Sequence, residues 1–164
     1  MRTRTSAIVA EGLVAGLLAH LAIALVLIVG DLAAGRALFY SPMLLASAVL
    51  EGGAQGCQVA TGATLLLAYT SMHLVALTGM GIVGSWLVHA SEEHPGLWFG
   101  ALMAFVFVAW HLSAAVLGFM GPVQGCVSLW PVTVAGFAGA LAMAGYLWRG
   151  HPRLRRVLRD EQFA

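Results

Sequence analysis

Long apolar runs without a formal charge constrain this chain more than any other feature, and the run from about residue 59 to 88 is one of them. A helix needs roughly 20 predominantly apolar residues to cross the hydrocarbon core of a bilayer. Hydrophobic residues make up 60% of the 164 residues and charged residues only 9%, so the chain has too little polar surface to cover a water-soluble globule. The sequence therefore predicts an all-α integral membrane protein that has the lipid bilayer as a partner.

Four runs are long enough to span, and we expect them to pack as one transmembrane four-helix bundle covering residues 1–164. The expected spans are about 7–29, 59–88, 97–120 and 127–147. Between the first two, Ser41-Pro42 is a helix-start signal, which predicts a short interfacial helix over about 42–50. The polar stretch 89–96 is expected to be the turn between spans two and three.

The basic residues are all arginines, and they gather at the two ends of the chain. Arg36 is the single exception, and the tail 149–164 carries most of them. By the positive-inside rule both termini are expected in the cytoplasm, which agrees with an even number of spans. We therefore expect an N-in, C-in protein of the bacterial inner membrane with the interfacial helix on the periplasmic face. Its first span should act as an uncleaved signal-anchor.

Small residues at helical spacing predict which helix faces pack inward. Gly12, Gly16, His20 and Ala24 are four residues apart and fall on one side of the first span. A second stripe of small residues lies in the last span and contains Gly136, Gly139, Ala140 and Ala144. Because small residues let neighbouring backbones approach in a membrane, both stripes are expected at helix contacts.

Three histidines lie inside expected spans, and an ionisable group at that depth usually faces protein. They are His20, His73 and His111. Counted from the outer helix ends they fall at similar depths, so they could meet at one level. One interpretation is that these histidines make polar contacts between helices. A more specific one is axial ligation of a b-type haem by His73 together with His20 or His111. In that case Arg36 could bind a haem propionate.

A third interpretation is a metal or quinone site, because Tyr69 and His73 lie one turn apart on the same face. No acidic residue is near the three histidines in sequence, which argues against hydrolytic zinc. Glu11 is interpreted as reaching the cytoplasmic interface, with a proton or ion role inside the bundle as the alternative. The remaining histidines, His89, His94 and His151, are interpreted as solvated residues.

The two cysteines, Cys57 and Cys126, both fall on the expected periplasmic side, where thiols pair if they come close enough. Each follows a Gln-Gly pair ahead of a span, as a duplication would produce. A structural disulfide and two free buried thiols are both open interpretations. A redox-catalytic role is disfavoured because the chain has no Cys-x-x-Cys motif.

One further pattern is Asp31-x-x-x-Gly35-Arg36-x-Leu38-Phe39-x-x-Pro42, followed later by Tyr69-Thr-Ser-Met-His73 and by a tail from Tyr146 to Arg153. It resembles a pattern of small four-span bacterial inner-membrane proteins that have no assigned activity. The resemblance covers most of the chain in outline and implies fold and compartment only.

The sequence contains no phosphate-binding glycine loop, catalytic triad or nucleic-acid-binding surface. Because no soluble domain is left beside the spans, we expect a small non-catalytic subunit of a larger inner-membrane complex, with other membrane subunits as partners. Electron transfer, respiratory or photosynthetic, is the expected process. The alternatives are a haem b electron carrier or quinone-site subunit, and a small transporter or channel whose polar path would link Glu11, His20 and His73.

Overall fold

The computed structural model describes residues 4–50, 57, 62–100, 102–103, 126 and 129–161, and every element in these ranges is helical. Three helices are long and apolar enough to cross a membrane: α1 (Arg4–Ala33), α3 (Ala63–Glu93) and α5 (Leu129–Gly150). The shorter elements are α2 (Tyr40–Leu50), η2 (Pro95–Leu97) and α6 (Pro152–Glu161). The expected third span, 97–120, lies almost entirely outside the described residues.

The three long helices end later than the predicted spans, and the largest difference is at the end of α3. The polar stretch from His89 was expected to be a turn, but α3 continues to Glu93 and the backbone leaves the helix only at His94. Residues 89–94 contain no proline or glycine that would break the helix before Pro95. The Ser91 hydroxyl also donates to the Leu87 carbonyl within the helix. The turn prediction was therefore wrong for residues 89–93, which places His89 on a rigid helix.

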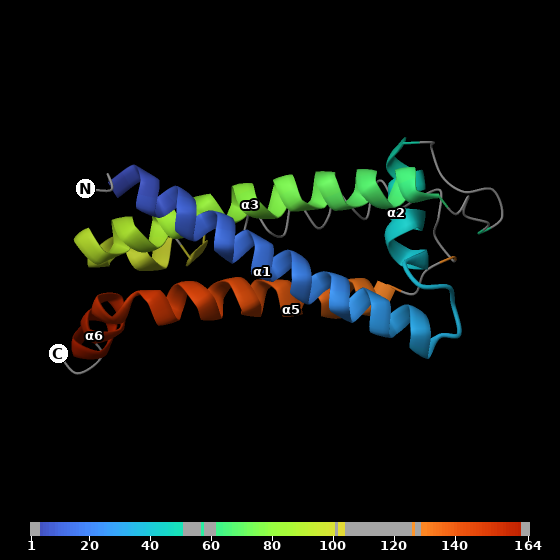
Figure 1. Cartoon of the computed structure of the whole chain (residues 1–164). Coiled ribbons are helices and arrows are strands. Elements are labelled where there is room, and N and C mark those ends of the chain that lie inside the picture. The colour runs from blue at the N-terminus through green and yellow to red at the C-terminus, as the bar shows by residue number, and fades with distance from the viewer. Residues whose placement is uncertain are drawn as a thin grey trace.

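Helix α1 is the centre of the described bundle. In Figure 1 it crosses between α3 and α5, and both chain ends lie at the same end of the bundle. It contacts both of these helices extensively, whereas α3 and α5 have few contacts with each other. Towards α5, Ile23 and Leu27 pack with Ala135, and Ala15 and Ala19 pack with a second group, Met143 and Leu147.

The contact between α1 and α3 depends on glycine. A Cβ atom on Gly12 would overlap the backbone of Ile82, one on Gly16 would lie 2.5 Å from the Thr78 Cα, and one on Gly81 would overlap the Gly12 carbonyl oxygen. The two backbones are therefore in direct contact, as the small-residue face predicted for the first span requires. This contact fixes the register of everything that α1 presents to α3.

The opposite end of the bundle is closed by α2 and a disulfide. In Figure 1, α2 runs across the ends of the long helices rather than along them. Its Met43 and Ala46 pack on Leu65 of α3. Asp31, which is 1% exposed, accepts hydrogen bonds from the Ser41 backbone N–H (2.8 Å) and hydroxyl (2.6 Å), and so caps the start of α2. Of the two interpretations of the cysteines, the structure has the disulfide, Cys57–Cys126.

We predict that Gly81→Val lowers the free energy of unfolding by about 1–3 kcal/mol, because the new side chain must push α1 away from α3. Gly79→Val is the matched control: it lies two residues earlier in the same helix, is exposed, and a Cβ there has no atom within 4 Å. Thermal or denaturant unfolding in mild detergent, followed by circular dichroism, measures both. Equal losses for the two variants would mean that the glycine contact contributes nothing.

Candidate functional site

Two of the three histidines predicted to share a level are in contact. His20 of α1 and His73 of α3 bring their Nδ1 atoms to 3.2 Å, so one ring donates an N–H to the other. Tyr69, one turn before His73, stacks on its imidazole with ring centroids 5.0 Å apart. The side chains of His20 and His73 therefore face protein, as the depth argument predicted. His111 lies outside the described residues.

A haem between these two rings would require them to separate. Two axial imidazoles lie on opposite faces of the porphyrin plane, whereas the Nδ1 atoms of His20 and His73 are in direct contact in this structure. Arg36, expected to bind a propionate, lies at the end of the bundle that carries α2. There it is 3.9 Å from the Asp31 carboxylate and sits over the Tyr40 ring. The pairing of His73 with His111 is not tested by the described residues.

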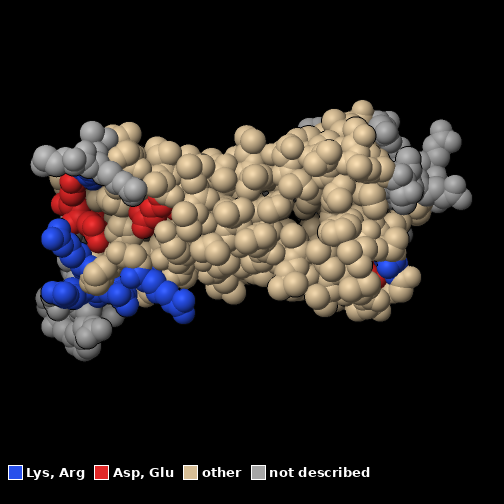
Figure 2. All heavy atoms as spheres, in the orientation of Figure 1, with Lys and Arg blue, Asp and Glu red and all other residues tan. Residues whose placement is uncertain are grey.

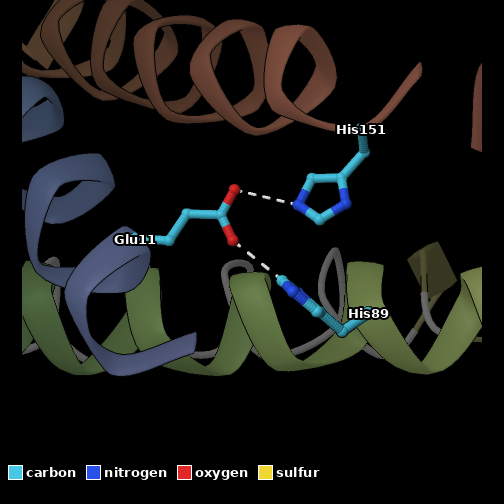
Figure 3. A group of neighbouring side chains, drawn as sticks. All are labelled: Glu11, His89 and His151. Carbon is cyan, nitrogen blue, oxygen red and sulfur yellow. Dashed lines mark hydrogen bonds and ion pairs between the residues drawn. The ribbon is translucent and has the colours of Figure 1, made fainter. Parts of the chain in front are cut away.

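A second polar cluster, not predicted from the sequence, lies at the end of the bundle that carries both termini. It contains Glu11 of α1, His89 of α3 and His151, which is the residue between α5 and α6. Figure 3 shows the two imidazoles pointing toward the Glu11 carboxylate, one toward each of its oxygens. One ligand atom from each of these residues lies within 4.8 Å of the others.

Glu11 is the centre of this cluster. Its Oε1 is 2.9 Å from the Nε2 of His151, and its Oε2 accepts the Ser85 hydroxyl at 2.7 Å. The Nδ1 of His89 lies 3.6 Å from the same Oε2 and 3.0 Å from the Ser85 carbonyl oxygen. The Glu11 carboxylate therefore has one partner on α3 and another at the α5–α6 junction. It connects these elements in addition to lying near the end of the bundle.

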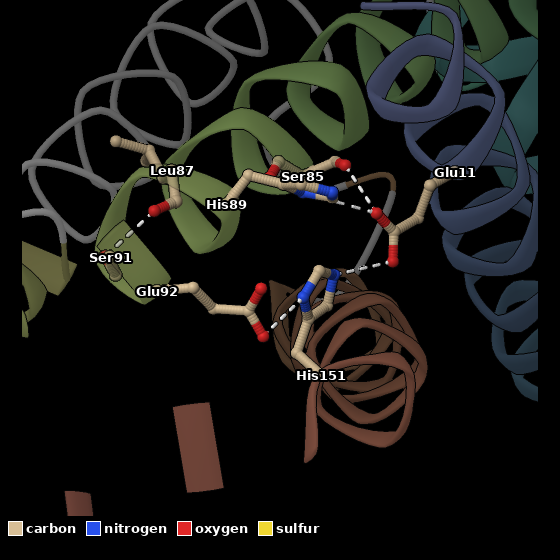
Figure 4. Close-up of polar contacts among 7 residues, drawn as sticks. All are labelled: Glu11, Ser85, Leu87, His89, Ser91, Glu92 and His151. Carbon is tan, nitrogen blue, oxygen red and sulfur yellow. Dashed lines mark hydrogen bonds and ion pairs between the residues drawn. The ribbon is translucent and has the colours of Figure 1, made fainter. Parts of the chain in front are cut away.

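Glu92 adds a second carboxylate behind His151. The Nδ1 of His151 is 3.1 Å from Glu92 Oε1, so the ring lies between two carboxylates, as Figure 4 shows. Because ionised carboxylates only accept hydrogen bonds, both contacts are hydrogen bonds only when both ring nitrogens carry a proton. His151 is only 6% exposed. Its interpretation as a solvated residue was therefore wrong, whereas His94 is exposed as expected.

The cluster was missed because its members come from three separate elements. Neither the spacing of His89 nor that of His151 marks a ligand, and their acidic partner Glu11 lies on another helix. One signal was present: Glu11 is the only acidic residue of α1 before Asp31, and it falls one residue before the small Gly12. A carboxylate beside a close helix contact must face the partner helix or its edge.

No family model, curated protein sequence or solved structure matches this chain.

We predict that His20 and His73 are energetically coupled through their direct hydrogen bond. A double-mutant cycle with His20→Ala, His73→Ala and the double variant should give a coupling of about 0.5–1.5 kcal/mol, the range of hydrogen bonds between helices in membranes. The measurement is the free energy of unfolding in detergent. A parallel cycle of His73→Ala with Leu21→Ala, an exposed neighbour of His20, should give none, and equal values in both cycles would remove the pair as a specific contact.

Proposed function

We propose that this chain is a non-catalytic helical subunit of a larger bacterial inner-membrane assembly, with electron transfer as the process that the assembly serves. The observation that carries the proposal is an exposed face of α5. Gly136, Ala140 and Ala144 are spaced four residues apart and all three are exposed, whereas their neighbour Gly139 is buried against Ile23 of α1. The last span therefore has two small-residue faces, and only one of them is used by the described bundle.

Lipid tails are as apolar as the side chains of a membrane helix, so the hydrophobic effect does not drive helices together in a bilayer. Close packing of their backbones is what stabilises the association. The exposed face has the small residues that allow such packing, flanked by Phe137 (68% exposed) and Leu141 (71%). Larger side chains would cover the helix if it faced only lipid. These features support a further helix on this face, and we propose that it comes from another subunit of a larger assembly.

The proposal includes four spans, with both termini in the cytoplasm and α2 at the periplasmic surface. Two independent features support this orientation. Figure 2 shows most of the visible basic side chains at one end of the bundle, the end where Figure 1 places both termini, and only a small basic patch at the other end. The disulfide lies at the other end, beside α2, and disulfides persist in oxidising compartments such as the periplasm. Because α3 ends and α5 begins at opposite ends of the bundle, the chain between Glu93 and Leu129 must pass from one end to the other, which supports a further span.

We predict the orientation from this arrangement. Alkaline phosphatase fused after Leu50 should be active in a bacterial host, since it would lie in the periplasm, whereas the same enzyme fused after Ala164 should be inactive. A fluorescent protein that matures only in the cytoplasm should give the reverse pattern at the two sites. The opposite result at either site would contradict the proposed orientation.

The assembly itself is tested with Ala140→Leu, which fills the middle of the exposed α5 face. Extracted from its own host in mild detergent, the wild-type chain should run on a native gel well above the monomer, in a band that contains other membrane chains. The variant should lose about tenfold or more of that band, because overpacking costs about 1–3 kcal/mol. Ala76→Leu, at an exposed alanine of α3, is the control and should not change the band. A wild-type chain that runs as a lone stable monomer, or with copies of itself only, would contradict the proposal.

The two alternatives are less well supported. Axial haem ligation by His20 and His73 would require the two rings to separate, and a reduced-minus-oxidised spectrum of the purified chain tests directly whether it carries haem. The direct line from Glu11 to His20 runs along the α1–α3 contact. There Gly12, Gly16 and Gly81 bring the two backbones together, so the described helices offer less support for a transport path than for a packed subunit.

A further inference from the structure

We propose that Glu11, His89 and His151 form a binding site for a divalent transition-metal ion, for which Zn²⁺ is the best match. The site offers one carboxylate oxygen and two imidazole nitrogens, with the three ligand atoms within 4.8 Å of one another (Figure 3). Two histidines and one glutamate are a donor set of zinc sites that keep an open coordination position. Imidazole also binds Co²⁺, which makes that ion a useful probe.

The distances are close to those that a bound ion requires. Two ligand atoms of a tetrahedral zinc ion lie about 3.4 Å apart, given Zn–N and Zn–O bonds of about 2.1 Å. His151 Nε2 lies 2.9 Å from Glu11 Oε1 and His89 Nδ1 lies 3.6 Å from Glu11 Oε2, one value on each side of this separation. One ligand atom of each residue lies within 4.8 Å of the others, so side-chain movement alone would bring all three to one ion. His89 Nδ1 would exchange its contact with the Ser85 carbonyl for the metal.

Two of the proposed ligands, His151 and Glu11, already have neighbouring hydrogen-bond partners of the kind that orient metal ligands. A metal-binding histidine usually directs its other ring nitrogen at a carboxylate, which fixes the ring orientation. The Nδ1 of His151 has this contact with Glu92, which leaves Nε2 directed at Glu11 (Figure 4). The Ser85 hydroxyl orients the Glu11 carboxylate in the same way. Each contact is made by a residue of α3, which the glycine contact holds against α1.

The charges also favour a cation here. Glu11 and Glu92 bring two carboxylates to a group of side chains that are each less than a quarter exposed. A divalent ion between Glu11 and His151 would replace the proton that now links them and would balance both negative charges. Three protein ligands leave one position open to water or to a donor group from another molecule.

The test uses the full-length chain in detergent, purified with a tag that contains no histidine and stripped of metal with EDTA. Calorimetric titration with Zn²⁺ should give one ion per chain, and Co²⁺ should give visible absorption bands with the same stoichiometry. We expect Glu11→Gln and His151→Gln to weaken Zn²⁺ binding at least 100-fold. Glu92→Gln, which removes only the group behind His151, should weaken it about 10- to 100-fold.

Two controls lie beside the site without belonging to it. Glu93→Gln changes an exposed carboxylate that pairs with Arg4, and His94→Gln changes an exposed imidazole, so neither should alter the affinity. The proposal is overturned if the wild-type chain, folded by circular dichroism, binds neither ion stoichiometrically. It is also overturned if Glu11→Gln and His151→Gln both retain wild-type affinity. Because only the isolated chain is used, the result does not depend on whether the proposed assembly exists.

Discussion

Direct backbone contact between α1 and α3 is the constraint on which the rest of the described structure depends. Gly12 and Gly16 on one helix and Gly81 on the other allow a separation that any side chain would prevent. Once the two backbones touch, the positions of the polar groups on either side follow. Glu11 meets Ser85 just before the contact, and His20 meets His73 just after it. A single antiparallel register therefore places both groups of polar side chains.

The two acidic residues of α1, one near each end of the helix, connect it to other elements by hydrogen bonds. Near its start, Glu11 holds Ser85 of α3 and His151 at the beginning of the α6 segment. At its far end, Asp31 caps α2, and Arg36 lies close enough to offset part of its charge. In a chain with few charged residues, both carboxylates of α1 are thus used to connect separate elements. A buried carboxylate without such partners would be very costly, which explains why neither faces lipid.

Much of this could be predicted from the sequence because it depends on local patterns. Apolar run length predicted the three described long helices, and spacing by four predicted that Gly12, Gly16 and His20 share a buried face. Depth along the helices predicted that His20 and His73 could meet. Helix ends were less predictable: α3 runs past His89 because tertiary contacts hold residues that local composition assigns to a turn. That five-residue extension is what brings His89 and Glu92 into the cluster at this end.

The cluster around Glu11 could not be predicted, since it depends on how three elements far apart in the sequence come together. It also differs chemically from the histidine pair in the middle of the bundle. His20 and His73 offer two nitrogens, and among the described residues their contacts include no carboxylate, so a divalent ion there would bring an uncompensated charge into the membrane interior. Glu11, with Glu92 behind His151, supplies the negative charge that such an ion needs. Two histidine sites in one bundle thus suit different roles, helix contact at the centre and cation binding at the end, because only one of them has carboxylates within reach.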